Sequence, residues 1–322
     1  MNETLVEVVH GRHNPGIDPG LSIWGWEIPT YLFLGGMAAG ILVLVALLEL
    51  RSGERPRSRA LRLMPFAALG LLALGMGALF LDLAHKLHVF RFYLAFRPTS
   101  PMSWGAWILL VVYPAGLLHG LGSLAASERE WLLSRASVLR GLLSRVFQLA
   151  DGQRRRVLWS SLVVGAGLGV YTGLLLGTLV ARIQWNSSAL GPLFLASGIS
   201  TGAAFILLFP LDEAERRKLV RWDVNAILVE LALLAVMLVG FSTGNETARF
   251  AGENLLGGGW TASFWSLVIV TGLLVPLSME LLELKRHLAF TLLAPALILV
   301  GGFALRAILV TAGLETAFRF VS

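Results

Sequence analysis

The sequence predicts an all-α integral membrane protein with eight transmembrane helices. The first observation is that it contains eight separate runs of roughly 20 apolar residues, each long enough to cross a bilayer. The second is that its 322 residues are 56% hydrophobic and only 14% charged, whereas soluble domains carry about 25% charged residues. The third is a mean hydropathy of +0.74. A polypeptide this apolar must place most of its length in lipid.

The apolar runs give the expected spans: 27–50, 61–83, 102–125, 157–181, 190–210, 221–242, 261–283 and 288–311. Glycine and proline inside these runs are compatible with membrane helices. After an outer N-terminal segment (1–26), we expect two four-helix bundles, 27–181 and 182–322. The first and fifth spans share a pattern of small residues, Gly36 to Gly40 and Gly198 to Gly202, which indicates either an internal parallel repeat or close helix packing.

Charge predicts the orientation. The N-terminus, the loops 84–101, 182–189 and 243–260, and the C-terminus hold seven Lys and Arg residues, against eighteen in the other connections and their helix ends. Since basic loops stay in the cytoplasm, both termini are expected on the periplasmic side of a cytoplasmic (inner) membrane. The acidic, polar N-terminus is not expected to be a signal peptide. Residues 126–156 read as an amphipathic helix on the cytoplasmic surface.

Several functions are excluded or disfavoured by composition. There is no cysteine, so we expect no disulfide and no iron–sulfur cluster within the chain. The basic residues lie between apolar spans, which points to the lipid bilayer and not to nucleic acid as a partner. A membrane haem needs two histidines facing each other from different helices; only His119 and His287 suit, and His287 lies in a short loop. We therefore expect no haem and no metal site, and any electron must pass to a docked partner.

Polar residues gather where the first four spans meet the outer face. Glu27 and Tyr31 begin the first span, Asp82 and His85 end the second, Arg97 and Ser103 precede or begin the third, and Tyr171 and Arg182 lie at the outer end of the fourth. Such residues also anchor helices at a membrane interface, and we favour that interpretation for Lys86, His88 and Arg91.

A quinone needs an apolar slot, hydrogen-bond donors for its carbonyls and a proton acceptor, which this set supplies. Asp82 and His85 are three residues apart, so on a helix they would share a face and exchange protons near neutral pH. The expected catalytic groups are Asp82, His85 and Glu27.

Buried charges in the second half have two interpretations. Ionisable residues inside a membrane are costly and usually functional or paired. Glu230 and Arg306 could form an internal packing pair, although they differ in expected depth. Alternatively Glu230, Arg306, Glu280 and Glu49 could form a proton path from the cytoplasm.

Several segments resemble the NrfD/polysulfide-reductase membrane-subunit family. They are residues 96–107 (FRPTSPMSWGAW), 26–40 (WEIPTYLFLGGMAAG), 171–173 (YTG), 185–186 (WN) and 192–198 (PLFLASG). The resemblance covers about the first 210 residues, and the second half matches only in helix count.

The resemblance implies a membrane anchor of a respiratory oxidoreductase complex. Such an anchor exchanges electrons between menaquinone or ubiquinone and a four-cluster iron–sulfur subunit on the outer face, which serves a molybdopterin catalytic subunit. The family's quinone site implies contacts from Tyr171, Tyr31 and Asp82, although other members carry His or Asn where this chain has Ile28 and Tyr31. The full set of candidate quinone-binding residues is Tyr171, Tyr31, Arg97, Ser103, Trp104 and Arg182.

Two other functions remain open at this point. A secondary transporter or proton channel would use Glu230 and Arg306, because transporters place their sites near the midplane. A purely structural anchor would hold a soluble enzyme on the membrane without binding a quinone.

Overall fold

The computed structural model describes residues 24–83, 85–94, 96–179, 182–286 and 291–316. In these ranges the regular elements are helices, and eight helical segments are long and apolar enough to cross a membrane. They are α1 (Glu27–Ser52), α2 (Arg59–Asp82), α4 (Pro101–Ser123), α7 (Arg154–Gly177), α8 (Leu190–Leu207), α9 (Glu213–Thr243), the continuous segment α11 (Thr261–Ser263), η4 (Phe264–Leu274) and α12 (Val275–Arg286), and α13 (Leu293–Glu315). The prediction of an all-α, eight-span membrane protein is confirmed.

Helix boundaries follow from local chemistry. α1 ends at Gly53, whose left-handed φ of 71° is easily reached only by glycine, and α4 has Pro101 in its first turn. α9 begins eight residues before the expected residue 221 because Asp212 caps it, its side chain accepting a hydrogen bond from the Ala214 N–H. The first turns of α9 are charged, so an apolar run cannot reveal them.

α2 ends earlier than the Asp82–His85 pairing requires. Leu83 is extended, with φ −66° and ψ 125°, and His85 precedes a separate short 3₁₀ helix, η1 (Lys86–His88). The prediction that Asp82 and His85 share one helix face is therefore wrong, because the chain leaves the helix between them.

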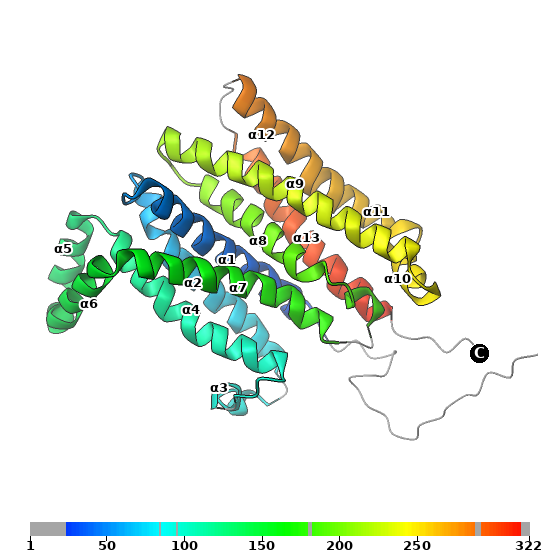
Figure 1. Cartoon of the computed structure of the whole chain (residues 1–322), viewed down its shortest axis with the longest axis horizontal. Helices are drawn as coiled ribbons and strands as arrows, with labels where there is room; N and C mark the ends of the chain where they lie inside the picture. Colours follow the sequence, from blue (N-terminus) through cyan, green and yellow to red (C-terminus); the bar gives the residue numbers. More distant parts are fainter. Residues whose placement is uncertain (1–23, 84, 95, 180–181, 287–290, 317–322) are drawn as a thin grey trace, which may run out of the picture.

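α1 and α8 occupy the centre of the molecule (Figure 1). α1 contacts α2, α7, α8 and α13, and α8 also contacts α7, α9 and α13. A Cβ on Gly40 would lie 1.9 Å from the Gly198 carbonyl oxygen, and one on Gly198 would lie 2.6 Å from the Gly36 oxygen. The close helix approach predicted from the small residues is confirmed, and the two glycine motifs contact each other.

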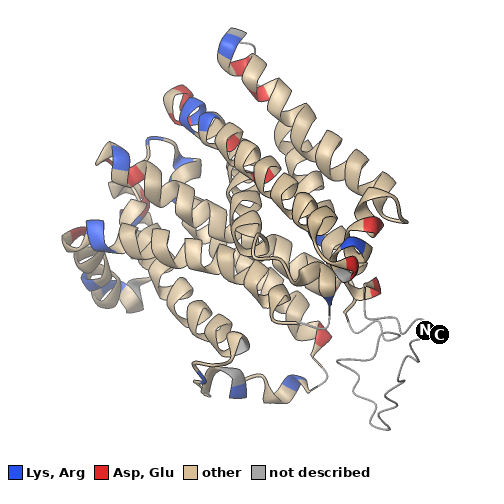
Figure 2. Cartoon of the chain, turned by 45° about the vertical axis from the view of Figure 1, so that its right-hand side comes forward, with Lys and Arg blue, Asp and Glu red and all other residues tan. Residues whose placement is uncertain are grey.

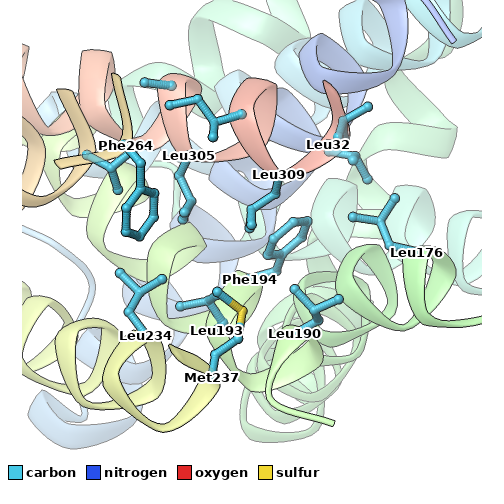
Figure 3. Packing of buried hydrophobic residues seen from close by; sticks show 14 of the residues in the cluster. Leu32, Leu176, Leu190, Leu193, Phe194, Leu234, Met237, Phe264, Leu305 and Leu309 are labelled. Atoms are coloured by element: carbon cyan, nitrogen blue, oxygen red, sulfur yellow. The ribbon is translucent and has the colours of Figure 1, made fainter. Parts of the chain in front are cut away.

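A large hydrophobic cluster joins helices from both halves of the chain. Its labelled members in Figure 3 come from α1, α7, α8, α9, η4 and α13 and include Leu32, Leu176, Leu193, Phe194, Leu234, Phe264, Leu305 and Leu309.

Trp185, in the short η3 helix (Ile183–Trp185), is 1% exposed and belongs to this cluster. It stacks on Trp24 at 5.2 Å, and its indole N–H donates to the Leu309 carbonyl at 2.7 Å. These contacts bring the start of α1 and the last third of α13 to the same end of the molecule.

The seventh span contains an unexpected π-helix, Phe264–Leu274. Long π-helical runs are rare, and the apolar pattern of this segment does not distinguish one from an α-helix. Here the segment lies against α13 at a glycine pair: a Cβ on Gly272 would lie 2.6 Å from the Gly301 Cα.

Basic residues are concentrated at the end of the bundle opposite the start of α1 (Figure 2). The predicted amphipathic segment lies at this end and forms two helices instead of one, α5 (Ala126–Arg135) and α6 (Arg140–Gly152). They cover a small apolar cluster of Leu121, Leu124 and Phe147, with the Arg129 guanidinium 4.8 Å from the Phe147 ring centre.

Candidate functional site

A cavity of about 210 Å³ lies between α1, α2, α4 and α7, at the end where α1 begins. Its wall is mostly apolar and includes Trp24, Ile28, Met76, Leu79, Phe80, Val89, Leu109, Leu175 and Leu179. Its polar groups are few: the phenols of Tyr31, Tyr93 and Tyr171, the carboxyl of Asp82 and the hydroxyl of Thr178. An apolar pocket with a few convergent polar groups is the usual form of a small-molecule site.

Tyr171 reaches the cavity because residue 105 is glycine. The tyrosine is 5% exposed on α7, and its ring lies against the α4 backbone. A Cβ on Gly105 would lie 2.1 Å from the Tyr171 hydroxyl oxygen and 2.2 Å from its Cζ. The Ser-Trp-Gly-Ala-Trp sequence (103–107) near the start of α4 therefore contains the one residue type that leaves room for this phenol.

Tyr31 and Tyr93 complete a group of three phenols. Tyr31, on α1, is 2% exposed, and its hydroxyl is close enough to interact electrostatically with those of Tyr171 and Tyr93. Neither Tyr31 nor Tyr171 forms a hydrogen bond through its hydroxyl with another residue of the described ranges. Among the described residues, both phenols are thus available to donate to a molecule in the cavity.

Tyr93, in the short helix α3 (Arg91–Leu94), was not predicted as a site residue. The chain has only four tyrosines, and three of them line this cavity. That scarcity is the signal that sequence reasoning could have used.

Asp82 supplies the carboxyl group of the cavity wall. It is the last residue of α2 and is half-buried. Glu27 does not line the cavity, but its carboxylate is close enough to repel that of Asp82. The predicted acids are thus neighbours, with one inside the site and one at its margin.

His85 and Arg182 are not among the lining residues. His85 is exposed, and its ring centre is 6.1 Å from that of His88. Arg182 is 3% exposed and donates to the Leu314 carbonyl at the end of α13, and its burial lowers the pKa of the guanidinium. Arg182 therefore ties the α7–α8 connection to α13.

Arg97, Ser103 and Trp104 fix the loop before α4 and do not line the cavity. The Arg97 backbone N–H donates to Ser103 Oγ at 3.0 Å. The Trp104 indole N–H donates to the Pro98 carbonyl at 2.6 Å. These contacts hold the Pro-Thr-Ser-Pro turn against the first turn of α4, directly before Gly105.

A second polar group lies between α8, α9 and α13. Glu230 and Arg306 are 2% and 0% exposed. Arg306 Nη1 donates to Ser197 Oγ at 2.8 Å and to the Gly302 carbonyl at 2.7 Å. The Glu230 carboxyl lies beside the same serine and attracts the guanidinium electrostatically. Ser197 thus links the two charges, which form no direct ion pair among the described contacts.

Glu280 lies beside Asp223, an acid that was not predicted. Asp223 on α9 and Glu280 on α12 are 0% and 2% exposed. The Asp223 carboxyl lies beside the Ser200 hydroxyl and the Glu280 carboxyl, yet no oxygen of either acid has a hydrogen bond of ordinary geometry to a described residue. Asp223 could have been found from its spacing, because it lies seven residues before Glu230 and so on the same helix face.

Glu49 belongs to a separate network near the opposite end of α1. Its carboxylate accepts hydrogen bonds from Ser123 and from Arg154 at 2.8 Å, and lies 3.3 Å from His119 Nε2. His119 Nδ1 is 2.8 Å from Ser161 Oγ. The four residues of the predicted proton path therefore fall into two networks. His287, the other histidine of the haem argument, lies outside the described residues.

Within the described ranges, no group of three or more His, Cys, Asp or Glu side chains could hold a metal ion. The fold and the cavity together define a class: a multi-pass, all-α membrane protein with an apolar cavity between four of its helices.

Residues 14–317 match the family described as "Polysulphide reductase, NrfD", so the chain belongs to that family, as predicted. The match extends beyond the first 210 residues and includes the second half, where only the helix count had suggested a resemblance.

Named relatives cover most of the chain. A polysulfide reductase chain of Wolinella succinogenes is 29% identical over 304 residues, 90% of this chain and 94% of its own length. Protein NrfD of Escherichia coli strain K12 is 30% identical over 268 residues, 80% of this chain and 84% of its own. A selenate reductase subunit of Mesobacillus selenatarsenatis is 25% identical over 252 residues, covering 71% of this chain and 56% of that protein. Two of these names designate components of reductases.

Proposed function

We propose that this chain is the quinone-reactive membrane subunit of a respiratory oxidoreductase complex. The observation that carries the proposal is the cavity, whose apolar wall holds the Tyr31 and Tyr171 phenols and the Asp82 carboxyl. A quinone ring and its isoprenoid tail fit an apolar wall, and each ring carbonyl accepts a hydrogen bond.

The residues divide the chemistry between them. Tyr31 and Tyr171 donate hydrogen bonds to the ring carbonyls and hold the ring in place. Asp82 accepts or donates the protons that quinol oxidation releases or quinone reduction consumes, and Glu27 passes them between Asp82 and the surface. Quinol oxidation yields two electrons and two protons. The menaquinone or ubiquinone supplies the redox step, and the protein's residues position it and handle its protons.

The electrons require a partner at the same end of the molecule. The names of the relatives support a reductase complex, in which a four-cluster iron–sulfur subunit would take electrons and pass them to a molybdopterin subunit. Both would dock on the outer face of the inner membrane, with residues 27–181 forming the quinone-binding bundle and 182–322 the second bundle. The basic end of the molecule supports this orientation.

A proton path would join quinone exchange to the cytoplasm. We propose Glu230, Arg306 and Glu280 for its second-half route, with Glu49 serving a separate cytoplasmic network. The buried Arg306–Ser197–Glu230 contacts also fit a transporter or proton channel that works without quinone. Proton flux through the purified protein in liposomes, without any redox partner, would favour that second function.

Binding of a short-chain naphthoquinone to the purified protein tests the quinone site. Trp24 lies in the cavity wall, so quenching of tryptophan fluorescence can report occupancy. Tyr171→Phe removes one hydrogen bond worth about 1 kcal/mol, which should weaken binding roughly fivefold. Asp82→Asn should leave binding nearly intact and slow quinol-linked turnover of the complex.

Tyr113→Phe is the matched control, because Tyr113 is on α4 but is not a lining residue. Absence of saturable binding would refute the quinone site and leave a structural anchor. If Tyr171→Phe and Tyr113→Phe weaken binding equally, the hydrogen bond from Tyr171 is refuted while the quinone site itself stands.

A further inference from the structure

We propose that Asp223 and Glu280 together hold one exchangeable proton, and that this carboxyl pair is the proton-loading site on the cytoplasmic side of the second half. The inference deepens the proton-path part of the proposed function and does not depend on the quinone assignment.

The geometry of the pair comes from three helices. Asp223 on α9 lies beside Glu280 on α12 and beside Ser200 on α8. The three side chains are 0%, 2% and 1% exposed. None of the four carboxyl oxygens of the two acids has a hydrogen bond of ordinary geometry to a described residue, and the same is true of Ser200 Oγ. A buried serine hydroxyl beside two acids, with no hydrogen bond of ordinary geometry among them, leaves the group one shared hydrogen short of a satisfied network.

The surrounding charges leave this pair uncompensated. Glu230 is attracted by Arg306, and Glu283 lies 3.2 Å from Arg216 Nη1. Asp223 interacts electrostatically with Glu230 and Glu280, and Glu280 with Asp223 and Glu283, all of which are acids. No basic side chain of the described residues contributes to either member of the pair.

Two carboxylates cannot both remain ionised side by side in a medium of low polarity. One shared proton removes one charge and supplies the missing hydrogen bond. This is the arrangement of carboxyl dyads that titrate as a unit.

The pair lies between the cytoplasmic end and the centre of the molecule. Glu283 is one turn from Glu280 on α12 and is half-buried, so it connects the pair with the basic end. Asp223 is ten residues into α9, which corresponds to about 15 Å at 1.5 Å per residue. Glu230 is two turns further on the same face, so a proton released by the pair has a buried acid as its next acceptor.

Arg306 brings this route close to the helix that lines the quinone cavity. A Cβ on Gly36 of α1 would lie 3.0 Å from Arg306 Nη2, so the guanidinium lies directly against α1. Gly36 is five residues, or about 7.5 Å along the helix, from Tyr31 of the cavity. Along this route, the hydroxyls of Ser197 and Ser200 on α8 lie beside the acids of α9.

Infrared spectroscopy of the full-length protein in lipid tests the shared proton directly. Protonated carboxyl groups give a C=O band that shifts in D₂O, and the wild type should show one at neutral pH. Asp223→Asn and Glu280→Gln should each shift or remove that band, and the double variant should abolish it. Glu253→Gln, at an exposed acid of α10 (Glu246–Leu256) that acts on neither member of the pair, is the control and should leave the band unchanged.

The absence of such a band in the wild type, or its survival in the double variant, overturns the proposal. Loss of the band when sodium replaces a large organic cation also overturns it, and would assign the pair to sodium instead. Asn and Gln match the shapes of Asp and Glu, and the wild-type band and its sodium response are measured without any substitution, so a misfolded variant does not remove the test.

Proton yield in the assembled complex tests the consequence. Asp223→Asn should lower the number of protons moved per quinol oxidised in sealed vesicles, with the rate of quinol oxidation unchanged when an uncoupler is present. An unchanged proton yield overturns the loading role. If the quinone assignment is wrong, naphthoquinone does not bind but the infrared band is still observed. If only the carboxyl pair is wrong, the band is absent but naphthoquinone still binds.

Discussion

Replacement of Gly105 by alanine tests whether α4 positions the Tyr171 phenol. The added methyl group would lie 2.1 Å from the hydroxyl oxygen, 2.2 Å from Cζ and 2.5 Å from Cε1. Ordinary van der Waals contact begins near 3.4 Å, so the phenol tip must move by about 1.3 Å. Because α4 and α7 are packed helices, we expect the side chain to move and the helices to stay.

The expected loss can be bounded. Overpacking a well-filled site costs about 1–3 kcal/mol, while the hydrogen bond to the quinone carbonyl is worth about 1 kcal/mol. A misplacement of about 1 Å in a catalytic site lowers rates by roughly 100-fold. Gly105→Ala should therefore weaken naphthoquinone binding about fivefold and lower quinol-linked turnover by one to two powers of ten.

A double-mutant cycle in the assembled complex is the assay. Tyr171→Leu removes the ring atoms that the methyl group would strike, so adding Gly105→Ala to that background should change turnover little. Gly167→Ala, on α7 with nothing within 4 Å of the added atom, is the control. If Gly105→Ala is as harmful in the Tyr171→Leu background as in the wild type, or is harmless in the wild type, the positioning argument fails.

Three further predictions concern stability. Gly198→Ala would force a methyl group to within 2.6 Å of an α1 carbonyl oxygen and should destabilise the protein by about 1–3 kcal/mol; thermal unfolding in detergent measures this. Trp185→Phe loses the bond to the Leu309 carbonyl and part of a buried stack, which should cost about 2 kcal/mol by the same assay. Hydrogen bonding to Arg62 lowers the pKa of Glu128 below its ordinary value of 4.5. The stabilisation that this bond gives to the docking of α5 is therefore fully present above pH 4.5. It is lost as the pH falls through the lower pKa of the folded state.

Each of these has a matched control. Gly70→Ala meets nothing within 4 Å, and Trp159→Phe alters a half-exposed tryptophan, so both should unfold with the wild type. A fluorophore at Ser134→Cys on α5 is unique because the chain has no other cysteine. Its emission should report the acid transition, and Glu128→Gln should abolish the pH response. Wild-type behaviour of Gly198→Ala or Trp185→Phe, or an acid transition that persists in Glu128→Gln, would contradict the corresponding argument.

The membrane spans were predictable because hydropathy is a property summed over many residues. The start of α9 could not be predicted in this way, because its first two turns are charged. Only the helix-capping residue Asp212 indicates where the helix begins. The π-helix could not be predicted either, since Phe264–Leu274 has the same apolar content as an α-helical span.

The candidate site was predictable by residue type but not by contact. Tyr31, Tyr171 and Asp82 line one cavity, whereas Arg97, Ser103 and Trp104 hold the neighbouring loop. All six lie near one end of the molecule, and charge patterning alone cannot separate a lining residue from a supporting one. Such a distinction depends on side-chain direction over a few ångströms.

The Asp82–His85 pairing was wrong because it assumed that the helix continued. The backbone at Leu83 is extended, and the sequence there has no glycine or proline that would predict the end of the helix. Gly105 was visible within its motif, but its purpose depends on Tyr171, 66 residues further along the chain. Contacts between distant segments of this kind are available only from the fold.

The buried cluster of Figure 3 draws on helices from before and after residue 182. Neither part of the chain can therefore keep its apolar surface covered when the other is missing, since Leu32 and Leu176 need Phe194 and Leu309 as neighbours. Unfolding should accordingly be one cooperative transition, and the two parts expressed as separate polypeptides should be stable only when they are made together in the same membrane.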